Sequence, residues 1–126
     1  MDVLVIEDEA VLGKALQRGL SDSRYSCTWV RNGRKGLDLG LTQRFDAIVL
    51  DLLLPDMDGI EATALIRERE KHQGGRTPIV ALTAHTMKGD RERCLAAGMD
   101  NYINKPIDAV KFLEIVELTA AAPSGV

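Results

Sequence analysis

Four short runs of apolar residues are spread along the chain. They occupy residues 3–6 (VLVI), 47–50 (AIVL), 79–82 (IVAL) and the shorter pair at 102–103 (YI). Each run is too short for a helix, is rich in β-branched residues and does not alternate with polar residues. Runs of this kind indicate strands that are buried on both faces, as in a parallel sheet. A more polar run at residues 25–30 (YSCTWV) predicts a fifth strand, which suits the edge of the sheet.

Segments with the period of an α-helix fill the gaps between these strands. One of them ends at Gly98, a residue type that favours the position just after a helix. The last helix begins after Asp108, which can cap it, while Ile107 and Phe112 are spaced as a hydrophobic staple. Residues 67–76 (REREKHQGGR) indicate a solvated helix end and a loop. The apolar positions with helical spacing are Leu12, Leu16, Leu20, Leu37, Leu41, Ile60, Ala64, Leu65, Leu95, Ala96, Val110, Leu113 and Val116.

The alternation of strand and helix five times predicts an α/β fold. Right-handed crossovers place helices on both faces of a parallel sheet. For five strands we expect the flavodoxin-like (βα)5 doubly wound sandwich with strand order 2-1-3-4-5. The length of 126 residues suits one domain, which we place at residues 1–119. Residues 120–126 (AAAPSGV) then form a C-terminal tail or the stub of a linker.

Composition narrows the classes of protein that the chain can belong to. Hydrophobic residues make up 45% and charged residues 28%, as in ordinary globular proteins, and no apolar run approaches the ~20 residues of a membrane span. A net charge of −3 without a basic run argues against direct nucleic-acid binding. Cys27 and Cys94 lack metal-type spacing, and Asp2 follows Met1 without a signal-peptide pattern. We therefore expect a cytoplasmic protein with no membrane association.

Polar residues follow the predicted buried strands at the point where each strand ends. Glu7 and Asp8 follow the first, Asp51 the next, Thr83 the one after, and Lys105 the last. Each of these residues alone has an ordinary explanation as a cap or turn residue. Because ligands of open α/β sheets bind beyond the carboxyl ends of the strands, their coincidence at one edge favours a functional site.

The chemistry of this set is specific. Three carboxylates at one edge raise one another's pKa, and a hard divalent cation such as Mg²⁺ relieves their repulsion. An aspartate beside such a metal can attack phosphorus and form an aspartyl-phosphate. A lysine and a hydroxyl group can neutralise the charge of the transferred phosphoryl group. The set therefore predicts a site that accepts a phosphoryl group.

Four segments of the chain also carry a family resemblance. They are VLVIEDE (residues 3–9), FDAIVLDLLLPDMDG (45–59), PIVALTAH (78–85) and AAGMDNYINKPI (96–107). With these motifs the chain resembles a CheY-like receiver domain of two-component response regulators over nearly its whole length. The first half is most similar to receivers of OmpR/PhoB-type transcription factors. The second half is more similar to receivers fused to hybrid histidine kinases.

This resemblance assigns roles to the residues of the site. Asp51 is implied as the phosphorylated aspartate, and Lys105 as the contact of the phosphoryl group, with a cis bond to the following proline. Asp8 is implied as a Mg²⁺ ligand together with Asp51 and the backbone carbonyl of Leu53. Glu7 stands where many relatives have Asp, and its longer side chain favours binding through water.

The resemblance also implies a switch and its partners. Thr83 would move its hydroxyl onto the phosphoryl group while Tyr102 turns inward, which repacks the face formed by the last two helices and the strand between them. The donor would be a phosphohistidine on a histidine kinase or on a histidine phosphotransfer protein. The domain would catalyse only its own phosphorylation and dephosphorylation, and so is not an enzyme toward other substrates. The last helix (FLEIVELTAA, residues 112–121) lacks basic residues, so we expect a monomer or a weak phosphorylation-dependent dimer.

Two positions affect the lifetime of the acyl phosphate. Leu53 and His85 lie two residues after Asp51 and after Thr83 respectively. Leu53 cannot hydrogen-bond the water that hydrolyses the acyl phosphate. We therefore expect slow hydrolysis unless His85 orients that water.

Three other classes of protein compete with a receiver. A haloacid-dehalogenase-type phosphatase needs a second acid two residues after its nucleophile, where this chain has Leu53. A flavin-binding electron carrier would share the sheet order, but the acids at residues 7–9 would repel its phosphate. The third class is a degenerate receiver that only binds partners. The chain retains the complete set of site residues, which argues against this class: Asp8, Asp51, Thr83 and Lys105.

Overall fold

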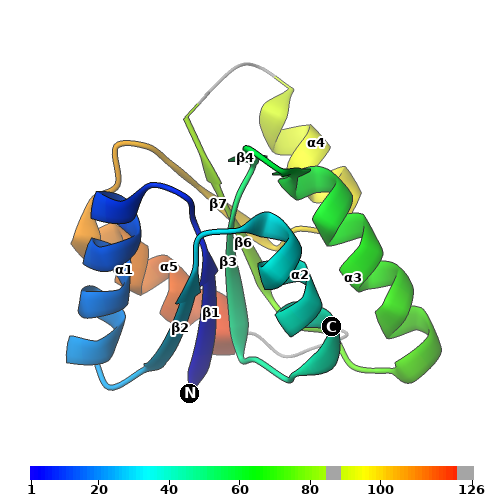
Figure 1. Ribbon diagram of the computed structural model, residues 1–126, viewed down its shortest axis with the longest axis horizontal. Helices are drawn as coiled ribbons and strands as arrows, with labels where there is room; N and C mark the ends of the chain where they lie inside the picture. The colour runs from blue at the N-terminus through cyan, green and yellow to red at the C-terminus, as the bar shows by residue number, and fades with distance from the viewer. Residues whose placement is uncertain (85–88, 122–126) are drawn as a thin grey trace.

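Five parallel strands form the central sheet of the protein (Figure 1). The computed structural model describes residues 1–84 and 89–121. Within them the sheet consists of β1 (Asp2–Ile6), β2 (Ser26–Val30), β3 (Ala47–Asp51), β6 (Ile79–Thr83) and β7 (Asn101–Asn104). The helices are α1 (Ala10–Asp22), α2 (Gly33–Thr42), α3 (Gly59–Gln73), α4 (Asp90–Ala97) and α5 (Ala109–Ala121). The strand order β2-β1-β3-β6-β7 confirms the predicted flavodoxin-like order.

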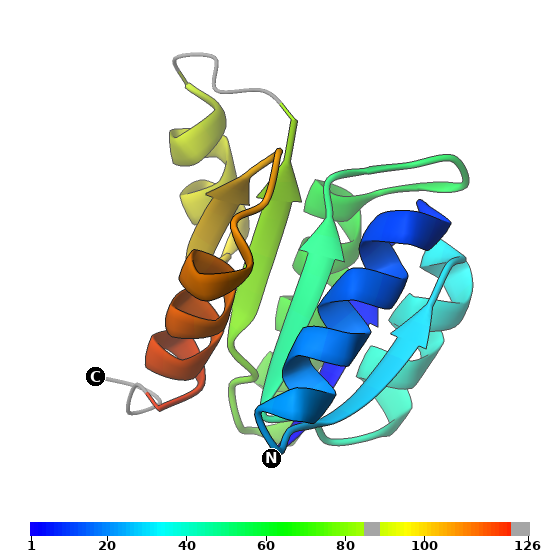
Figure 2. The same ribbon diagram turned by 90° about the vertical axis from the view of Figure 1, so that its left-hand side faces the viewer.

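Helices cover both faces of the sheet. Figures 1 and 2 show α1 and α5 on one face, and α2, α3 and α4 on the other. Alternate residues of β1 enter two separate cores, because Val3 and Val5 point toward α1 and α5 while Leu4 and Ile6 point the other way. Every residue of β3 and β6 is buried, as expected for central parallel strands. The partly exposed β2 lies at the edge, which confirms that prediction as well.

Helix faces were less predictable than strands. In α3 the buried residues include Ala62, Thr63 and Ile66, whereas Ala64 and Leu65 are exposed. Among residues 92–97 of α4 the buried side chain is Cys94, and α5 turns Phe112 and Val116 inward. The predicted apolar residues Leu95, Ala96 and Val110 are exposed. These helices carry apolar residues on more than one face, so spacing alone did not identify the side that packs on the sheet.

The prediction that residues 67–76 are solvated is wrong for Arg67, the first residue of that segment. The side chain of Arg67 is only 11% exposed, and its Nε donates a 2.9 Å hydrogen bond to the carbonyl of Gly98. Its guanidinium also forms ion pairs with Glu70 at 2.7 Å and with Asp100 at 2.8 Å. Gly98 and Asp100 lie between α4 and β7, so Arg67 joins α3 to the segment that precedes β7.

Helix ends follow the predicted capping residues. Gly98 ends α4 in the left-handed conformation with φ 104°. Asp108 accepts hydrogen bonds from the backbone N–H groups of Val110 at 2.9 Å and Lys111 at 3.3 Å, so it caps α5 as expected.

A short antiparallel hairpin follows β3 and was not predicted. Its strands are β4 (Leu53–Leu54) and β5 (Met57–Asp58). Asp56, in the turn of the hairpin, accepts 2.9 Å hydrogen bonds from the backbone N–H groups of Gly33 and Arg34. These hydrogen bonds lower the pKa of Asp56 and fasten the hairpin to the first turn of α2.

The predictions for His85 and for the C-terminal tail are not tested by the structure. His85 and the tail residues 122–126 lie outside the described residues, and the domain boundary at residue 119 stays a prediction, since α5 continues to Ala121. Among the helices of residues 1–84 and 89–121, none has the length and hydropathy that crossing a membrane requires.

Candidate functional site

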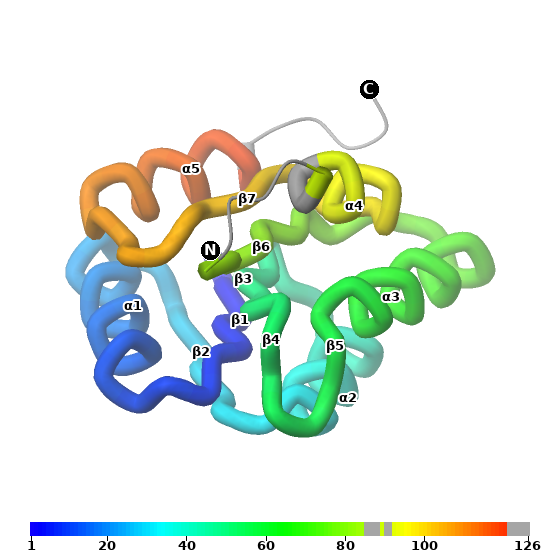
Figure 3. The backbone as a smooth tube through the Cα atoms, turned by 90° about the horizontal axis from the view of Figure 1, so that it is seen from above, coloured from blue at the N-terminus to red at the C-terminus, as the bar shows by residue number. Residues whose placement is uncertain are grey.

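The carboxyl ends of the strands bring the predicted site residues to one edge. In the parallel registers Ile6 pairs with Leu50, Asp51 with Leu82, and Thr83 with Asn104. The residues that follow these strand ends therefore lie side by side. Figure 3 views the sheet from this end, where β4 and β5 border the site.

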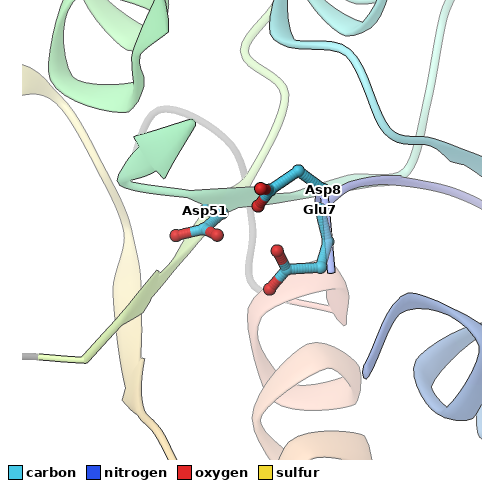
Figure 4. Close-up of side chains that lie close together, drawn as sticks. All are labelled: Glu7, Asp8 and Asp51. Atoms are coloured by element: carbon cyan, nitrogen blue, oxygen red, sulfur yellow. The ribbon is translucent and has the colours of Figure 1, made fainter. Parts of the chain in front are cut away.

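Three acids meet there. One carboxylate oxygen from each of Glu7, Asp8 and Asp51 lies within 4.8 Å of the others, and Figure 4 shows the three carboxylates gathered from the ends of β1 and β3. Glu7 is fully buried and Asp51 nearly so, while Asp8 is partly exposed. A cluster of carboxylate oxygens that opens to solvent on one side fits a hard divalent cation such as Mg²⁺.

Lys105 lies against two of these acids. Its Nζ is 3.1 Å from Oδ2 of Asp51 and 2.9 Å from Oε1 of Glu7. The contact of Lys105 with Asp51 is a hydrogen bond. Its contact with Oε1 of Glu7 is an ion pair without hydrogen-bond geometry, so this buried oxygen accepts no hydrogen bond. The other oxygen of Asp51 accepts a 3.1 Å hydrogen bond from the backbone N–H of Leu53. Carboxylate oxygens from three acids with one ammonium group beside them form a position where a further cation would be stabilised.

The electrostatics of the acids agree with this geometry. Burial and, to a smaller extent, the nearby Asp51 raise the pKa of Glu7 to about 7, although Lys105 and the backbone N–H of Glu9 act in the opposite direction. Burial alone would lower the pKa of Lys105, but its contacts with Glu7 and Asp51 outweigh burial and raise it. Lys105 thus pairs with two of the three acids, and a metal ion would supply further positive charge to the cluster.

The remaining predicted residues lie nearby. Thr83 is buried at the end of β6, and its carbonyl accepts a 2.7 Å hydrogen bond from the backbone N–H of Lys105. The peptide bond from Lys105 to Pro106 is cis, as expected. Tyr102 is half-buried in β7 and packs against the core on the α2–α4 face. Its predicted rotation, and the metal-binding carbonyl of Leu53, stay predictions.

Gly59 packs closely against the backbone of Asp51, a contact that was not predicted from the sequence. A Cβ atom added to Gly59 would lie 2.7 Å from the carbonyl oxygen of Asp51 and 2.9 Å from the Cα of Leu52. Gly59 therefore lets the start of α3 approach the backbone of the site directly.

Two further contacts were also missed. Trp29 and Arg31 donate hydrogen bonds to the backbone carbonyls of Glu7 and Asp8. The sequence indicates only that Trp29 packs beside the second strand. No motif in the chain marks either residue, since a hydrogen bond to a carbonyl depends on the path of the backbone and leaves no pattern of residue types.

The predicted family resemblance is confirmed by comparison with known families. The family model described as "Response regulator receiver domain" matches residues 3–117. The chain belongs to this family.

Curated relatives include both kinds that the motifs suggest. The chain is 37% identical over 119 residues to hybrid signal transduction histidine kinase I of Dictyostelium discoideum, covering 90% of this chain and 7% of that protein. It is 40% identical over 116 residues to the transcriptional activator protein IrlR of Burkholderia pseudomallei (strain 1026b), covering 92% of this chain and 47% of that protein. The chain therefore spans less than half of the length of these relatives.

Two solved structures are similar in fold and in sequence. The receiver domain of sensor histidine kinase PA1611 from Pseudomonas aeruginosa, with a magnesium ion coordinated in its active-site cleft, has a TM-score of 0.84 and 36% identity over 96% of this chain and 98% of that one. The receiver domain of the response regulator Ssk1 in complex with the histidine phosphotransfer protein Ypd1 of Saccharomyces cerevisiae has a TM-score of 0.89 and 27% identity. That match covers 95% of this chain and 88% of that one.

Proposed function

We propose that this domain accepts a phosphoryl group on Asp51 in a two-component phosphorelay. The observation that carries the proposal is the position of Asp51: buried at the carboxyl edge, beside two further acids and 3.1 Å from the ammonium group of Lys105. A carboxylate so placed has a cation on one side and space for a divalent metal on the other. This is the environment that phosphoryl transfer to an acid requires.

The donor is a phosphohistidine on a histidine kinase or a histidine phosphotransfer protein. The Ypd1–Ssk1 complex supports this choice, because a related receiver forms a complex with such a protein. A carboxylate oxygen of Asp51 attacks phosphorus, the P–N bond to the histidine breaks, and the imidazole leaves as the acyl phosphate forms. Lys105 neutralises charge on the transferred group throughout this step.

Asp8 and Asp51 would hold Mg²⁺, with Glu7 contributing through water and the carbonyl of Leu53 as a further ligand. The magnesium-containing PA1611 receiver and the acidic cluster of this chain support that assignment. When bound, Mg²⁺ supplies charge neutralisation at the phosphoryl oxygens. The carboxylates of the buried Glu7 and the partly exposed Asp8, at the end of β1, would balance the positive charge of the metal ion.

Phosphorylation would be read through Thr83 and Tyr102. Thr83 lies at the same edge as Asp51, so its hydroxyl can reach a phosphoryl oxygen, and Tyr102 precedes the site on the neighbouring strand β7. A repacked face of α4, β7 and α5 would then bind an output domain or a partner. In this proposal the domain catalyses only its own phosphorylation and dephosphorylation, acts in the cytoplasm, and is a monomer or a weak phosphorylation-dependent dimer.

The proposal is tested by transfer from a protein donor. A histidine phosphotransfer protein carrying ³²P on its histidine is mixed with this domain and Mg²⁺, beside an Asp51→Asn variant. We expect label to move to the parent within minutes and not to the variant. Equal labelling of both proteins would place the acceptor elsewhere, and labelling of neither by a panel of such donors would contradict the proposed phosphorelay role.

A further inference from the structure

The edge strand β2 and the residue that follows it contact the backbone of Glu7 and Asp8 through two side chains. The indole Nε1 of Trp29 donates a 2.9 Å hydrogen bond to the carbonyl of Glu7, and Nε of Arg31 donates a 3.0 Å hydrogen bond to the carbonyl of Asp8. Between them, the carbonyl of Val30 accepts a 3.1 Å hydrogen bond from the backbone N–H of Glu7. Three consecutive residues thus hold three of the four backbone polar groups of Glu7 and Asp8.

The two carbonyls lie on either side of Asp8. The Glu7 carbonyl belongs to the peptide group before Asp8, and the Asp8 carbonyl belongs to the peptide group after it. Fixing both groups fixes the backbone dihedral angles of Asp8, and with them the direction in which its side chain leaves the backbone.

Asp8 depends on this support more than Glu7 does. The carboxylate of Glu7 is also held by Lys105 and by the backbone N–H of Glu9. Among the described residues, the carboxylate of Asp8 makes no hydrogen bond and no ion pair. Before a metal binds, no polar contact of this side chain adds to the support that the backbone of Asp8 receives.

The position of Trp29 is built into the packing of α1 on the sheet. Trp29 pairs with Val5 in the β1–β2 register and lies on the face that α1 covers. A Cβ atom added to Gly13 of α1 would lie 2.1 to 2.3 Å from atoms of the indole ring. Gly13 therefore leaves the space in which the indole can reach the Glu7 carbonyl.

We propose that Trp29 and Arg31 are positioning residues for the Mg²⁺ site and act by fixing the backbone on both sides of Asp8. This inference rests on the proposed function, because it concerns the metal that the phosphoryl-accepting site would hold. Mg²⁺ demands near-ideal octahedral geometry, whereas Ca²⁺ accepts flexible arrangements with more ligands. Loosening the backbone at Asp8 therefore weakens Mg²⁺ binding more than Ca²⁺ binding.

The test compares the two cations by calorimetric titration of metal-free protein. Trp29→Phe keeps an aromatic ring and removes the N–H, and Arg31→Met keeps an aliphatic stem and removes the donors. We expect each variant to raise the Kd for Mg²⁺ about 3- to 10-fold, and the Kd for Ca²⁺ less than 2-fold. The double variant should lose about 10- to 100-fold in Mg²⁺ affinity.

A matched control distinguishes the loss of the hydrogen bond of Arg31 from the loss of its positive charge, and unfolding measurements detect a loss of stability. Arg34→Gln removes an equal charge three residues further along, on an exposed arginine whose backbone N–H, not its side chain, is used in the hairpin contact. Its Kd for Mg²⁺ should stay within 2-fold of the parent. The unfolding midpoint of each variant in EDTA is measured beside the titrations. In addition, the fluorescence of Trp29, which is the only tryptophan, should change on addition of Mg²⁺ to the parent.

Two results would overturn the inference alone: Mg²⁺ affinity unchanged in both variants, or equal losses for Mg²⁺ and Ca²⁺ that follow the loss of stability. Absence of Mg²⁺ binding by the parent would be different, because it contradicts the proposed function together with the inference. The phosphotransfer experiment with Asp51→Asn then shows independently whether the site accepts a phosphoryl group.

Discussion

The ammonium group of Lys105 lies 3.1 Å from a carboxylate oxygen of Asp51, a residue 54 positions earlier in the chain. The same ammonium group contacts Glu7, so one cation is shared by two buried acids. In this state Lys105 is the counter-ion of the acids. In the proposed reaction it becomes a counter-ion of the incoming phosphoryl group.

The first prediction concerns this lysine. Lys105→Met should slow phosphorylation of Asp51 by a small phosphodonor about 100-fold, because a charge aimed at the phosphoryl oxygens is lost. Mg²⁺ binding should persist, since the lysine competes with the metal for the same carboxylates. The rate is measured by mass spectrometry at saturating Mg²⁺. Lys111→Met, at an exposed lysine of α5, is the control and should react like the parent. A normal rate in Lys105→Met would remove the lysine from the mechanism.

The second prediction concerns pH. The pKa of Glu7 is raised from 4.5 to about 7, so the folded protein holds a proton that the unfolded chain releases at lower pH. The free energy of unfolding without metal should therefore fall as pH rises from about 4.5 to about 7, since the folded state binds more protons in that window. Glu7→Gln removes this contribution.

The comparison of parent and Glu7→Gln isolates that effect. In EDTA the two should have similar stability near pH 4.5, and the parent should become less stable than the variant by roughly 3 kcal/mol near pH 8. Urea unfolding across this range measures the difference. Parallel stability curves for the two proteins would show that Glu7 ionises at an ordinary pKa.

The third prediction concerns the close approach beneath the acceptor. Gly59→Ala would place a methyl group 2.7 Å from the Asp51 carbonyl oxygen and should destabilise the fold by about 2 kcal/mol. Gly19→Ala is the matched control: this glycine lies in α1 with no neighbouring atom within 4 Å of an added Cβ, so the change should stabilise by about 0.5–1 kcal/mol. Thermal unfolding of both variants checks the opposite signs. An unchanged stability of Gly59→Ala would mean that the loop after Asp51 moves to accommodate the added methyl group at little cost in free energy.

The fourth prediction concerns the lifetime of the acyl phosphate. Leu53 is 65% exposed beside Asp51 and offers no hydrogen bond to an attacking water. Leu53→Gln should hydrolyse its acyl phosphate about 5-fold faster than the parent, because the amide can orient that water. Loss of phosphate is followed after removal of the donor. Leu53→Ala adds no polar group and serves as the control, and slower loss in this variant than in the parent would contradict the role given to Leu53.

The sequence predicted the sheet and the site edge because both depend on strong local signals. Each buried strand is a run of apolar residues, and the polar residue that ends it, such as Asp51 or Thr83, marks the edge. The helix faces were harder. Ala64 and Leu65 have helical spacing with Ile60, yet α3 buries Ala62 and Thr63 instead.

Contacts between distant polar groups could not be predicted. Arg67 stands in a charged, alternating segment that is typical of a solvated helix, and only the fold brings the Gly98 carbonyl and Asp100 to it. The hydrogen bonds of Trp29 and Arg31 to the acidic loop are of the same kind. Such contacts depend on how two chain segments pass each other, and residue types alone do not encode that path.

The central claim is that Asp51 is the acceptor of a phosphoryl group. It is tested most directly by the intact mass of the protein after incubation with Mg²⁺ and acetyl phosphate, beside an Asp51→Ala control. We expect one added phosphoryl group in the parent and none in the control. An adduct that persists in Asp51→Ala would contradict it, as would a parent that stays unmodified with both acetyl phosphate and a phosphohistidine donor.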